Sequence, residues 1–278
     1  MSKNAYLFID GNYLLQRQKD VGDKWFGGDV IPIDYQRLAH GFKKVFFYDA
    51  LPGKWKNESP EDFEKRRTLK EMHFGYLRSL DGWHVIEGIS KRSSGNKAEQ
   101  KEVDILIAVD MLTHTHRRNM ESLTFIAGDQ DFRPLLDAVV REGMYVELWY
   151  AASSFSPELR TTADARRRLT ASDWWHYTYD SFRAFHAFPN IVRSGTEQQI
   201  SDASLVATGK RGSQVVAELW RNAESGMTLM KDVQQGYYTG QYAGLHWNRP
   251  DLDQYLKDLW NHLFCEGTPQ LPLVWSPA

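Results

Sequence analysis

Short apolar segments alternate with longer amphipathic segments through the first 150 residues of the chain. The apolar segments have the length of strands, and most are rich in β-branched or aromatic residues; they span residues 5–9, 45–48, 83–86, 123–127 and 145–150. Continuous apolar runs of this length are typical of strands buried on both faces. Helical patterns lie between them, around residues 38–42 and over residues 60–80, 103–115 and 132–142. The alternation predicts an α/β domain whose central sheet is mostly parallel and covered by helices on both faces.

The pattern changes after residue 150. Residues 156–169 look helical and end in three consecutive arginines, which a helix cannot present on one face, so a solvated or ion-paired role is favoured for them. Residues 174–179 fit an edge strand. Further along, the amphipathic patterns predict helices over residues 213–224 and 250–264 and a weaker one over residues 227–238. We therefore expect two domains, residues 1–179 and residues 195–278, the second mainly helical, with a winged-helix-like fold as one candidate.

Composition limits the class of protein. Of the 278 residues, 42% are hydrophobic and 25% are charged, which is the balance of a globular chain. The formal net charge of -2 provides no global basic field, so a nucleic acid would have to be held by a local patch. Cys265 is the only cysteine, which excludes an intrachain disulfide and fits a reducing compartment. No apolar run approaches the roughly 20 residues that span a bilayer, so we expect a cytoplasmic protein with no membrane partner.

Aspartates follow the predicted strands at the points where the strands end. Asp10 follows the first strand, and Asp129 and Asp131 follow the fourth. Asp104 lies in the first turn of the helix between them, and Asp110 lies further along that helix. Ligands of parallel sheets bind at the carboxyl ends of the strands. The side chains of Asp10, Asp104, Asp129 and Asp131 are therefore expected to converge on one crevice there. Asp104 and Asp110, six residues apart, point about 120° apart on a helix and cannot both face a single ion well.

Such a group of carboxylates is chemically suited to a divalent cation. Several carboxylates repel one another, and a cation removes that repulsion. Oxygen ligands favour Mg²⁺ or Mn²⁺ over softer metals. A bound Mg²⁺ activates water and stabilises the charge that develops on a phosphodiester. The simpler alternative is that these aspartates only cap turns and helices, as Asp commonly does, and the two roles are compatible.

Three ordered motifs resemble the NYN family, also called LabA-like or DUF88. They are Phe8-Ile9-Asp10-Gly11-Asn12, then Lys101-Glu102-Val103-Asp104 continuing to Asp110, then Ala127-Gly128-Asp129-Gln130-Asp131-Phe132. The resemblance covers roughly residues 4–178, and it implies a PIN-like (NYN) three-layer fold and metal-dependent RNA cleavage. The chain departs from the family pattern at Tyr13 and at Glu102, where Gly is usual. The C-terminal part resembles no family.

Matched residue by residue, the resemblance implies an acidic catalytic site. Its members are Asp10, Asp104, Asp129 and Asp131, with Mg²⁺ or Mn²⁺ held by the first three. Asn12, Asp110 and Lys101 are then expected to orient the metal ligands or the substrate. Asp110 is as readily structural, and for Lys101 the simpler role of a solvated lysine is favoured.

A polar segment over residues 90–101 is a second candidate for RNA contact. It carries Lys91, Arg92 and Lys97, which are either phosphate contacts or solubilising charges of an exposed loop.

The leading hypothesis is thus an endoribonuclease acting on single-stranded or structured RNA. An RNA-binding or scaffolding module with weak or no catalysis is the first alternative, and a phosphohydrolase acting on DNA or small phosphate esters is the second. The C-terminal region is expected to bind a protein partner or another copy of the chain. Residues 179–278 carry 8 basic and 10 acidic residues, which favours protein contacts at least as much as RNA contacts.

Overall fold

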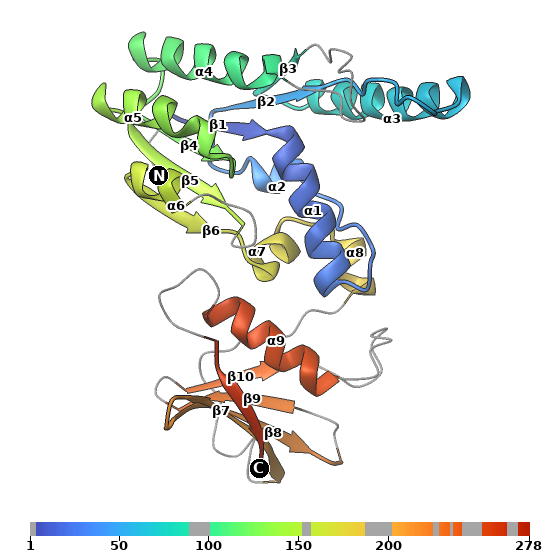
Figure 1. Ribbon diagram of the computed structural model, residues 1–278, viewed down its shortest axis with the longest axis vertical. Helices are drawn as coiled ribbons and strands as arrows, with labels where there is room; N and C mark the ends of the chain where they lie inside the picture. Colours follow the sequence, from blue (N-terminus) through green and yellow to red (C-terminus); the bar gives the residue numbers. More distant parts are fainter. Residues whose placement is uncertain are drawn as a thin grey trace. The chain divides into compact units, whose positions relative to one another are not determined.

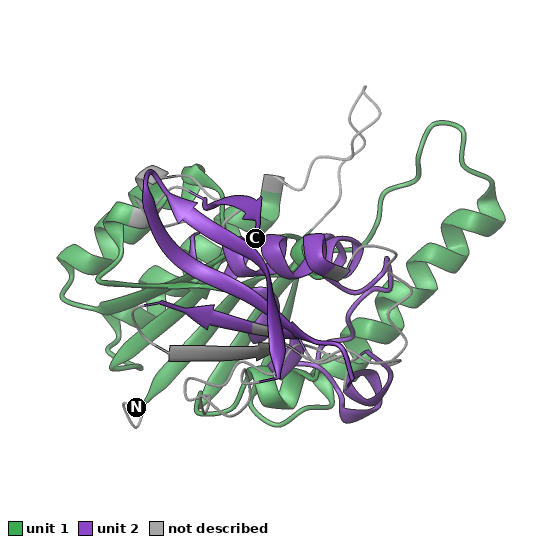
Figure 2. Ribbon diagram, turned by 90° about the horizontal axis from the view of Figure 1, so that it is seen from below, with its two compact units in different colours: residues 1–18, 34–169 green, residues 19–33, 170–278 purple. Residues whose placement is uncertain are grey.

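The computed structural model describes residues 4–88, 101–151, 157–186, 202–224, 228–233, 236–240, 252–265 and 272–278. The chain divides into two compact units, coloured separately in Figure 2. Unit 1 consists of Met1–Gln18 and Asp34–Leu169, and unit 2 consists of Lys19–Ile33 and Thr170–Ala278. No described helix is both long and apolar enough to cross a membrane.

Unit 1 is built around a six-stranded sheet in which every neighbouring pair is parallel. The strand order is β3-β2-β1-β4-β5-β6. The strands are β1 (Ala5–Asp10), β2 (Lys44–Ala50), β3 (Trp83–Gly88), β4 (Ser122–Ile126), β5 (Tyr145–Tyr150) and β6 (Ala165–Arg168). The predicted α/β class with a mostly parallel central sheet is confirmed.

The helices of unit 1 connect these strands (Figure 1). They are α1 (Gly11–Trp25, whose last part belongs to unit 2), α2 (Tyr35–Leu38), α3 (Pro60–Arg78), α4 (Lys101–His116), the short 3₁₀ helix η1 (Gln130–Phe132), α5 (Arg133–Arg141) and α6 (Pro157–Thr162). Local sequence sets several of their ends. Ser59 caps α3 by accepting a hydrogen bond from the Asp62 N–H, and Pro60 fixes the first turn. Gly143, with φ of +83°, follows α5 in a conformation that favours glycine.

Alternate residues of the central strands pack into two separate apolar layers. On one face, Tyr6 and Phe8 belong to a core that includes Ile107 of α4 and Leu136 of α5. On the other face, Phe47 of β2 makes edge contacts with Phe74 of α3 and Tyr35 of α2. Because both faces are covered, the strands read as continuous apolar runs. The result is the predicted three-layer arrangement.

Two local predictions in this part of the chain need correction. The helix expected over residues 156–169 is divided into α6 and β6, so the three arginines lie on an edge strand. The edge strand expected over residues 174–179 is instead the helix α7 (Ala171–His176). Thr170 begins α7 with a capping box that it forms with Asp173, and this polar pair favours a helix start over a strand.

Unit 2 contains a five-stranded antiparallel sheet, so the expectation of a mainly helical C-terminal region was wrong. The strand order is β10-β9-β8-β7-β11. The strands are β7 (Ala203–Arg211), β8 (Gln214–Asn222), β9 (Thr228–Asp232), β10 (Gly236–Gly240) and β11 (Val274–Pro277). The helix predicted over residues 213–224 is β8, and the one predicted over residues 227–238 is β9 and β10. The helix predicted over residues 250–264 is present as α9 (Leu252–Phe264).

Segments far apart in sequence pack together within unit 2. Trp25, at the end of α1, contacts the rings of Tyr255 and His262 on α9, with ring centroids 5.7 and 4.9 Å apart. Phe26 contacts Phe182 on α8 (Asp180–Phe185) at 5.6 Å. Residues 19–33 are therefore held by side chains that come much later in the chain.

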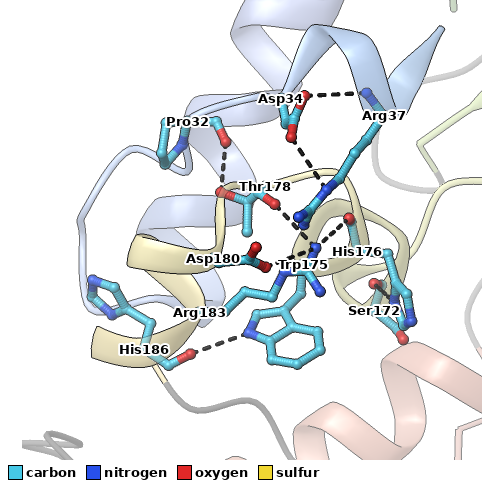
Figure 3. A network of polar contacts seen from close by, with 10 residues as sticks. All are labelled: Pro32, Asp34, Arg37, Ser172, Trp175, His176, Thr178, Asp180, Arg183 and His186. Atoms are coloured by element: carbon cyan, nitrogen blue, oxygen red, sulfur yellow. Dashed lines mark hydrogen bonds and ion pairs between the residues drawn. The ribbon is translucent and has the colours of Figure 1, made fainter. Parts of the chain in front are cut away.

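Polar contacts reinforce this packing (Figure 3). The Thr178 hydroxyl donates to the Pro32 carbonyl at 2.6 Å. The Trp175 indole N–H donates to the His186 carbonyl at 3.1 Å. Arg183 donates to the carbonyls of His176 and Thr178. These bonds satisfy carbonyl groups at the end of α7 and around α8.

Candidate functional site

Asp10 is the last residue of β1, at the point where the order of the sheet reverses. β1 pairs with β2 on one side and with β4 on the other, so the connections leaving β1 and those leaving β4 run in opposite directions across the sheet (Figure 1). In open parallel sheets the crevice outside the strand ends at such a switch point is the usual ligand site. Asp10 is therefore placed where chemistry is expected.

The turn after Asp10 is fixed by the backbone of its neighbours. Gly11 starts α1 directly, and a Cβ at this position would come within 2.8 Å of the Tyr48 carbonyl oxygen and closer still to the Phe47 ring. The Tyr13 N–H donates to Asp10 Oδ1 at 3.1 Å. The Tyr13 hydroxyl in turn accepts from the Ala151 N–H at 2.9 Å, which ties the start of α1 to the end of β5.

Asp104 reaches the same edge of the sheet from the first turn of α4. The neighbouring Val103 is buried against Gly88 at the end of β3, and a Cβ on Gly88 would meet its side chain at 2.6 Å. This close contact holds the start of α4 at the carboxyl ends of the strands. Asp104 itself is exposed there.

Asp129 and Asp131 follow β4 and surround the start of η1. Asp129 Oδ1 accepts from the Asp131 N–H at 3.0 Å, so Asp129 caps the short helix. Both residues are exposed. The capping role considered for Asp129 is therefore present, and it leaves the second oxygen of that carboxylate available for another ligand.

Electrostatics links these carboxylates into one group. Burial raises the pKa of Asp10 to about 7, and the nearby charges of Asp104 and Asp49 raise it as well. Burial, followed by the charges of Asp129 and Asp131, raises the pKa of Asp104. The charge of Asp104 therefore acts on Asp10, and the charges of Asp129 and Asp131 act on Asp104.

Asp49 is a member of this group that the sequence reasoning missed. It is the second-last residue of β2, the strand beside β1, and only 1% of it is exposed. Its carboxylate accepts from the Ala50 N–H at 2.7 Å and forms an ion pair with Lys70 of α3. The signal was available, because Asp49 directly follows the apolar run of residues 45–48, as Asp10 follows its own.

The remaining predicted site residues are placed differently. Asp110 lies away from the group and accepts a hydrogen bond from the Tyr48 hydroxyl at 3.0 Å, on the face of the sheet that α4 covers. Asn12 is exposed in the first turn of α1. The side chain of Lys101 and all of Lys91, Arg92 and Lys97 lie outside the described residues.

The donor set fits a divalent cation by its chemistry. Within the described part of the chain, Asp10, Asp104, Asp129 and Asp131 form no ion pair, whereas Asp49 has Lys70. Burial and neighbouring carboxylates raise the pKa values of Asp10 and Asp104. With no cationic partner there, the four carboxylates have charge to offer a hard metal ion. As the described side chains stand, no three of them are close enough to form a complete metal-binding group.

The raised pKa of Asp10 predicts a pH-dependent stability. In metal-free buffer the unfolded chain loses this proton near pH 4, while the folded chain holds it until about pH 7. The free energy of unfolding should therefore fall as pH rises between these values, by about 2 kcal/mol once partial exposure of the carboxylate is allowed for. Urea titrations of the wild type and of Asp10→Asn at pH 4.5 and pH 8 measure the difference. An equal pH dependence in both proteins would contradict the assigned shift.

The ion pair between Lys70 and Asp49 predicts that replacing Lys70 strongly lowers the stability of the protein. Lys70→Met keeps much of the side-chain volume but leaves the buried Asp49 carboxylate without its cation. We expect a loss of about 3 kcal/mol in the free energy of unfolding. Adding Asp49→Asn to this variant removes the stranded charge and should recover most of the loss in a double-mutant cycle. Additive effects of the two substitutions would show that the pair is not coupled.

Comparison with known proteins adds one family. The model of the NYN domain matches residues 4–169. No curated protein matches the chain. Among solved structures, a protein of unknown function from Vibrio parahaemolyticus is similar at 15% identity, over 60% of this chain and 93% of that one, with a TM-score of 0.42. That structural similarity is too low to carry an argument.

Proposed function

Because the chain belongs to the NYN domain family, whose members are generally PIN-like nucleases, we propose that it is a metal-dependent endoribonuclease that cleaves RNA phosphodiester bonds. The observation that carries the proposal is the group of carboxylates at the switch point of the sheet. Asp10 ends β1, and the pair Asp129 and Asp131 follows the neighbouring strand β4. The charge of Asp104 raises the pKa of Asp10, and the charges of Asp129 and Asp131 raise the pKa of Asp104.

The proposal assigns a role to each member of the group. Asp10, Asp104 and Asp129 hold Mg²⁺ or Mn²⁺, and Asp131 completes the shell or orients a water. Asn12, exposed in the first turn of α1 two residues after Asp10, would hydrogen-bond a ligand or the scissile phosphate. When bound, the cation neutralises the carboxylates, makes water a better nucleophile and stabilises charge on the phosphodiester.

The chain's own hydrogen bonds orient Asp10. The Tyr13 N–H holds one of its oxygens, and the Tyr13 hydroxyl is fixed by the Ala151 N–H. The carboxylate is therefore oriented by the start of α1, which is itself tied to the end of β5, before any ligand arrives, and this reduces the ordering cost of binding. Proton loss from Asp10 near pH 7 should accompany metal binding, so affinity for the metal should rise with pH.

Partners and location follow from the same proposal. RNA, single-stranded or structured, is the substrate, and the cytoplasm is the proposed compartment. We retain the two-domain division into residues 1–179 and 195–278 as a proposal, with unit 2 contributing substrate choice or assembly through a protein partner or a second copy.

The test is a cleavage assay with matched substrates. The purified chain is incubated with labelled single-stranded RNA, a hairpin RNA and DNA of the same sequence, each with Mn²⁺, with Mg²⁺ or with EDTA. Internal cleavage of RNA only in the presence of metal supports the proposal. RNA binding without cleavage under all conditions would favour the non-catalytic RNA-binding module instead, and preferential cutting of DNA would replace RNA as the substrate.

A further inference from the structure

The edge strand β6 brings three consecutive arginines to the same sheet as the carboxylate group. β6 pairs in parallel with β5, with Arg166 opposite Leu148 and Arg168 opposite Tyr150. Because the strands are parallel, the end of β6 lies at the edge of the sheet where Asp10 and Asp129 lie. The Leu169 N–H donates to the Tyr150 carbonyl at 2.7 Å, which fixes this end of the strand.

Strand geometry separates the three side chains. Arg166 and Arg168 point to one face and Arg167 to the other, because side chains alternate along a strand. Arg167 lies over the Trp149 ring at 4.7 Å and is partly buried. Arg166 is exposed, and no carboxylate pairs with it among the described residues. Arg168 is partly buried at the end of the strand. A helix would have spread these charges around its axis, whereas the strand places two of them on one side.

We propose that Arg166 and Arg168 form a phosphate-binding strip for single-stranded RNA that extends from the carboxylate group across the ends of β4 and β5. This proposal rests on the proposed function, and it specifies which part of the protein the RNA substrate crosses. Between β1 and β6 there are three strand spacings of roughly 4.8 Å, or about 14 Å in all. About four nucleotides cover this distance at roughly 3.4 Å per nucleotide of stacked strand.

The charge distribution of the chain implies that RNA binding needs a local group of cations. The chain has a net charge of -2, and its candidate site is acidic, so the site alone would repel RNA. Arginine is suited to phosphate because its planar guanidinium donates two parallel hydrogen bonds. The competing explanation is that charged residues on an edge strand only prevent pairing with another sheet edge. In that case the charge would matter for aggregation and not for RNA.

The experiment measures binding without catalysis. The full chain is titrated with a fluorescent single-stranded RNA in EDTA at several salt concentrations, beside Arg166→Gln/Arg168→Gln. We expect about tenfold weaker binding at low salt. The slope of log affinity against log salt should fall by about 1.4, because each lost phosphate contact of a single strand removes roughly 0.7. The matched control is Arg117→Gln/Arg118→Gln, which removes two exposed charges at the end of α4, at the opposite edge of the sheet, and should leave the slope unchanged.

Further variants separate the outcomes. Arg166→Lys/Arg168→Lys keeps the charge and should restore most of the slope, whereas a purely structural role for the arginines would leave it reduced. Equal slopes in the wild type and the Gln variant would overturn the strip, and so would equal losses in the Gln variant and in the control. Because no metal is present, this assay measures binding independently of cleavage. A wild type that binds RNA here with the expected slope, but does not cleave it in the separate assay with Mn²⁺ or Mg²⁺, would end the nuclease proposal and support the strip.

Discussion

Asp10→Asn should reduce metal-dependent RNA cleavage by at least about 10³-fold while leaving the fold intact. Burial and the charges of Asp104 and Asp49 raise the pKa of Asp10, and its replacement removes a charged ligand from the proposed metal site. A thousandfold loss corresponds to about 4 kcal/mol of transition-state stabilisation, at 1.36 kcal/mol per tenfold. Asparagine has nearly the same shape and still accepts the hydrogen bond from the Tyr13 N–H. The measurement is the single-turnover rate on the RNA that the wild type cleaves.

The matched control is Asp81→Asn, the same substitution in an exposed turn at the amino end of β3. It should cleave at the wild-type rate. The melting temperature of Asp10→Asn without metal should equal or exceed that of the wild type, because a repelling carboxylate is gone. Mn²⁺ should raise the melting temperature of the wild type and of Asp81→Asn but not that of Asp10→Asn. Unaltered cleavage by Asp10→Asn would show that the activity does not come from this site.

Much of unit 1 was predictable because its strands are buried on both faces. Burial of this kind leaves a continuous apolar run, and the polar residue that ends the run then marks the edge where ligands bind. Asp10 and Asp129 were found in this way. Asp49 was overlooked because Ala50 prolongs the strand beyond it, and its cation Lys70 lies on a different element. A contact between elements leaves no trace in local sequence.

The helix α1 was missed although its signal was present. Its buried residues Leu14, Val21 and Trp25 are spaced by seven and four positions, which is a helical period. Gly22 and the polar residues around it weaken this helical pattern. In the structure Gly22 is required for a close approach, because a Cβ there would lie 2.3 Å from the Asp29 carbonyl oxygen. Tertiary packing outweighed the low helix propensity of glycine.

The C-terminal sheet was misread for a different reason. Val216, Leu219 and Trp220 have helical spacing, which predicts an amphipathic helix. The buried residues of β8 are Ala217 and Leu219, two positions apart, as expected of a strand with one covered face. Short apolar patterns of this kind fit both periods, and the choice depends on the partners β7 and β9, which pair with β8 along its length.

A fragment ending at residue 179 should be poorly soluble, and two polar substitutions should rescue it. Such a fragment retains Trp25 and Phe26 but loses Tyr255, His262 and Phe182, the rings that contact them. Trp25 and Phe26 are each only 3% exposed in the full chain. Burial of a large aromatic side chain contributes about 3 to 5 kcal/mol, and exposing two of them together creates an aggregation-prone patch.

The rescue variant is Trp25→Gln/Phe26→Gln within residues 1–179. The apolar cluster between the sheet and helices α4 and α5 ends at Ala163, so this layer of the core is complete in the fragment, and the four site aspartates lie within residues 10–131. We expect a soluble fragment that unfolds cooperatively and keeps metal-dependent cleavage of a generic RNA, whereas the same two substitutions should destabilise the full chain. Solubility, urea unfolding and cleavage are measured for both fragments and both full-length chains. A fragment that is soluble without the substitutions would show that other residues of the fragment bury Trp25 and Phe26. A rescued fragment that folds but does not cleave RNA would assign part of the activity to unit 2. The carboxylate group would then not be sufficient for cleavage without the residues that the fragment lacks.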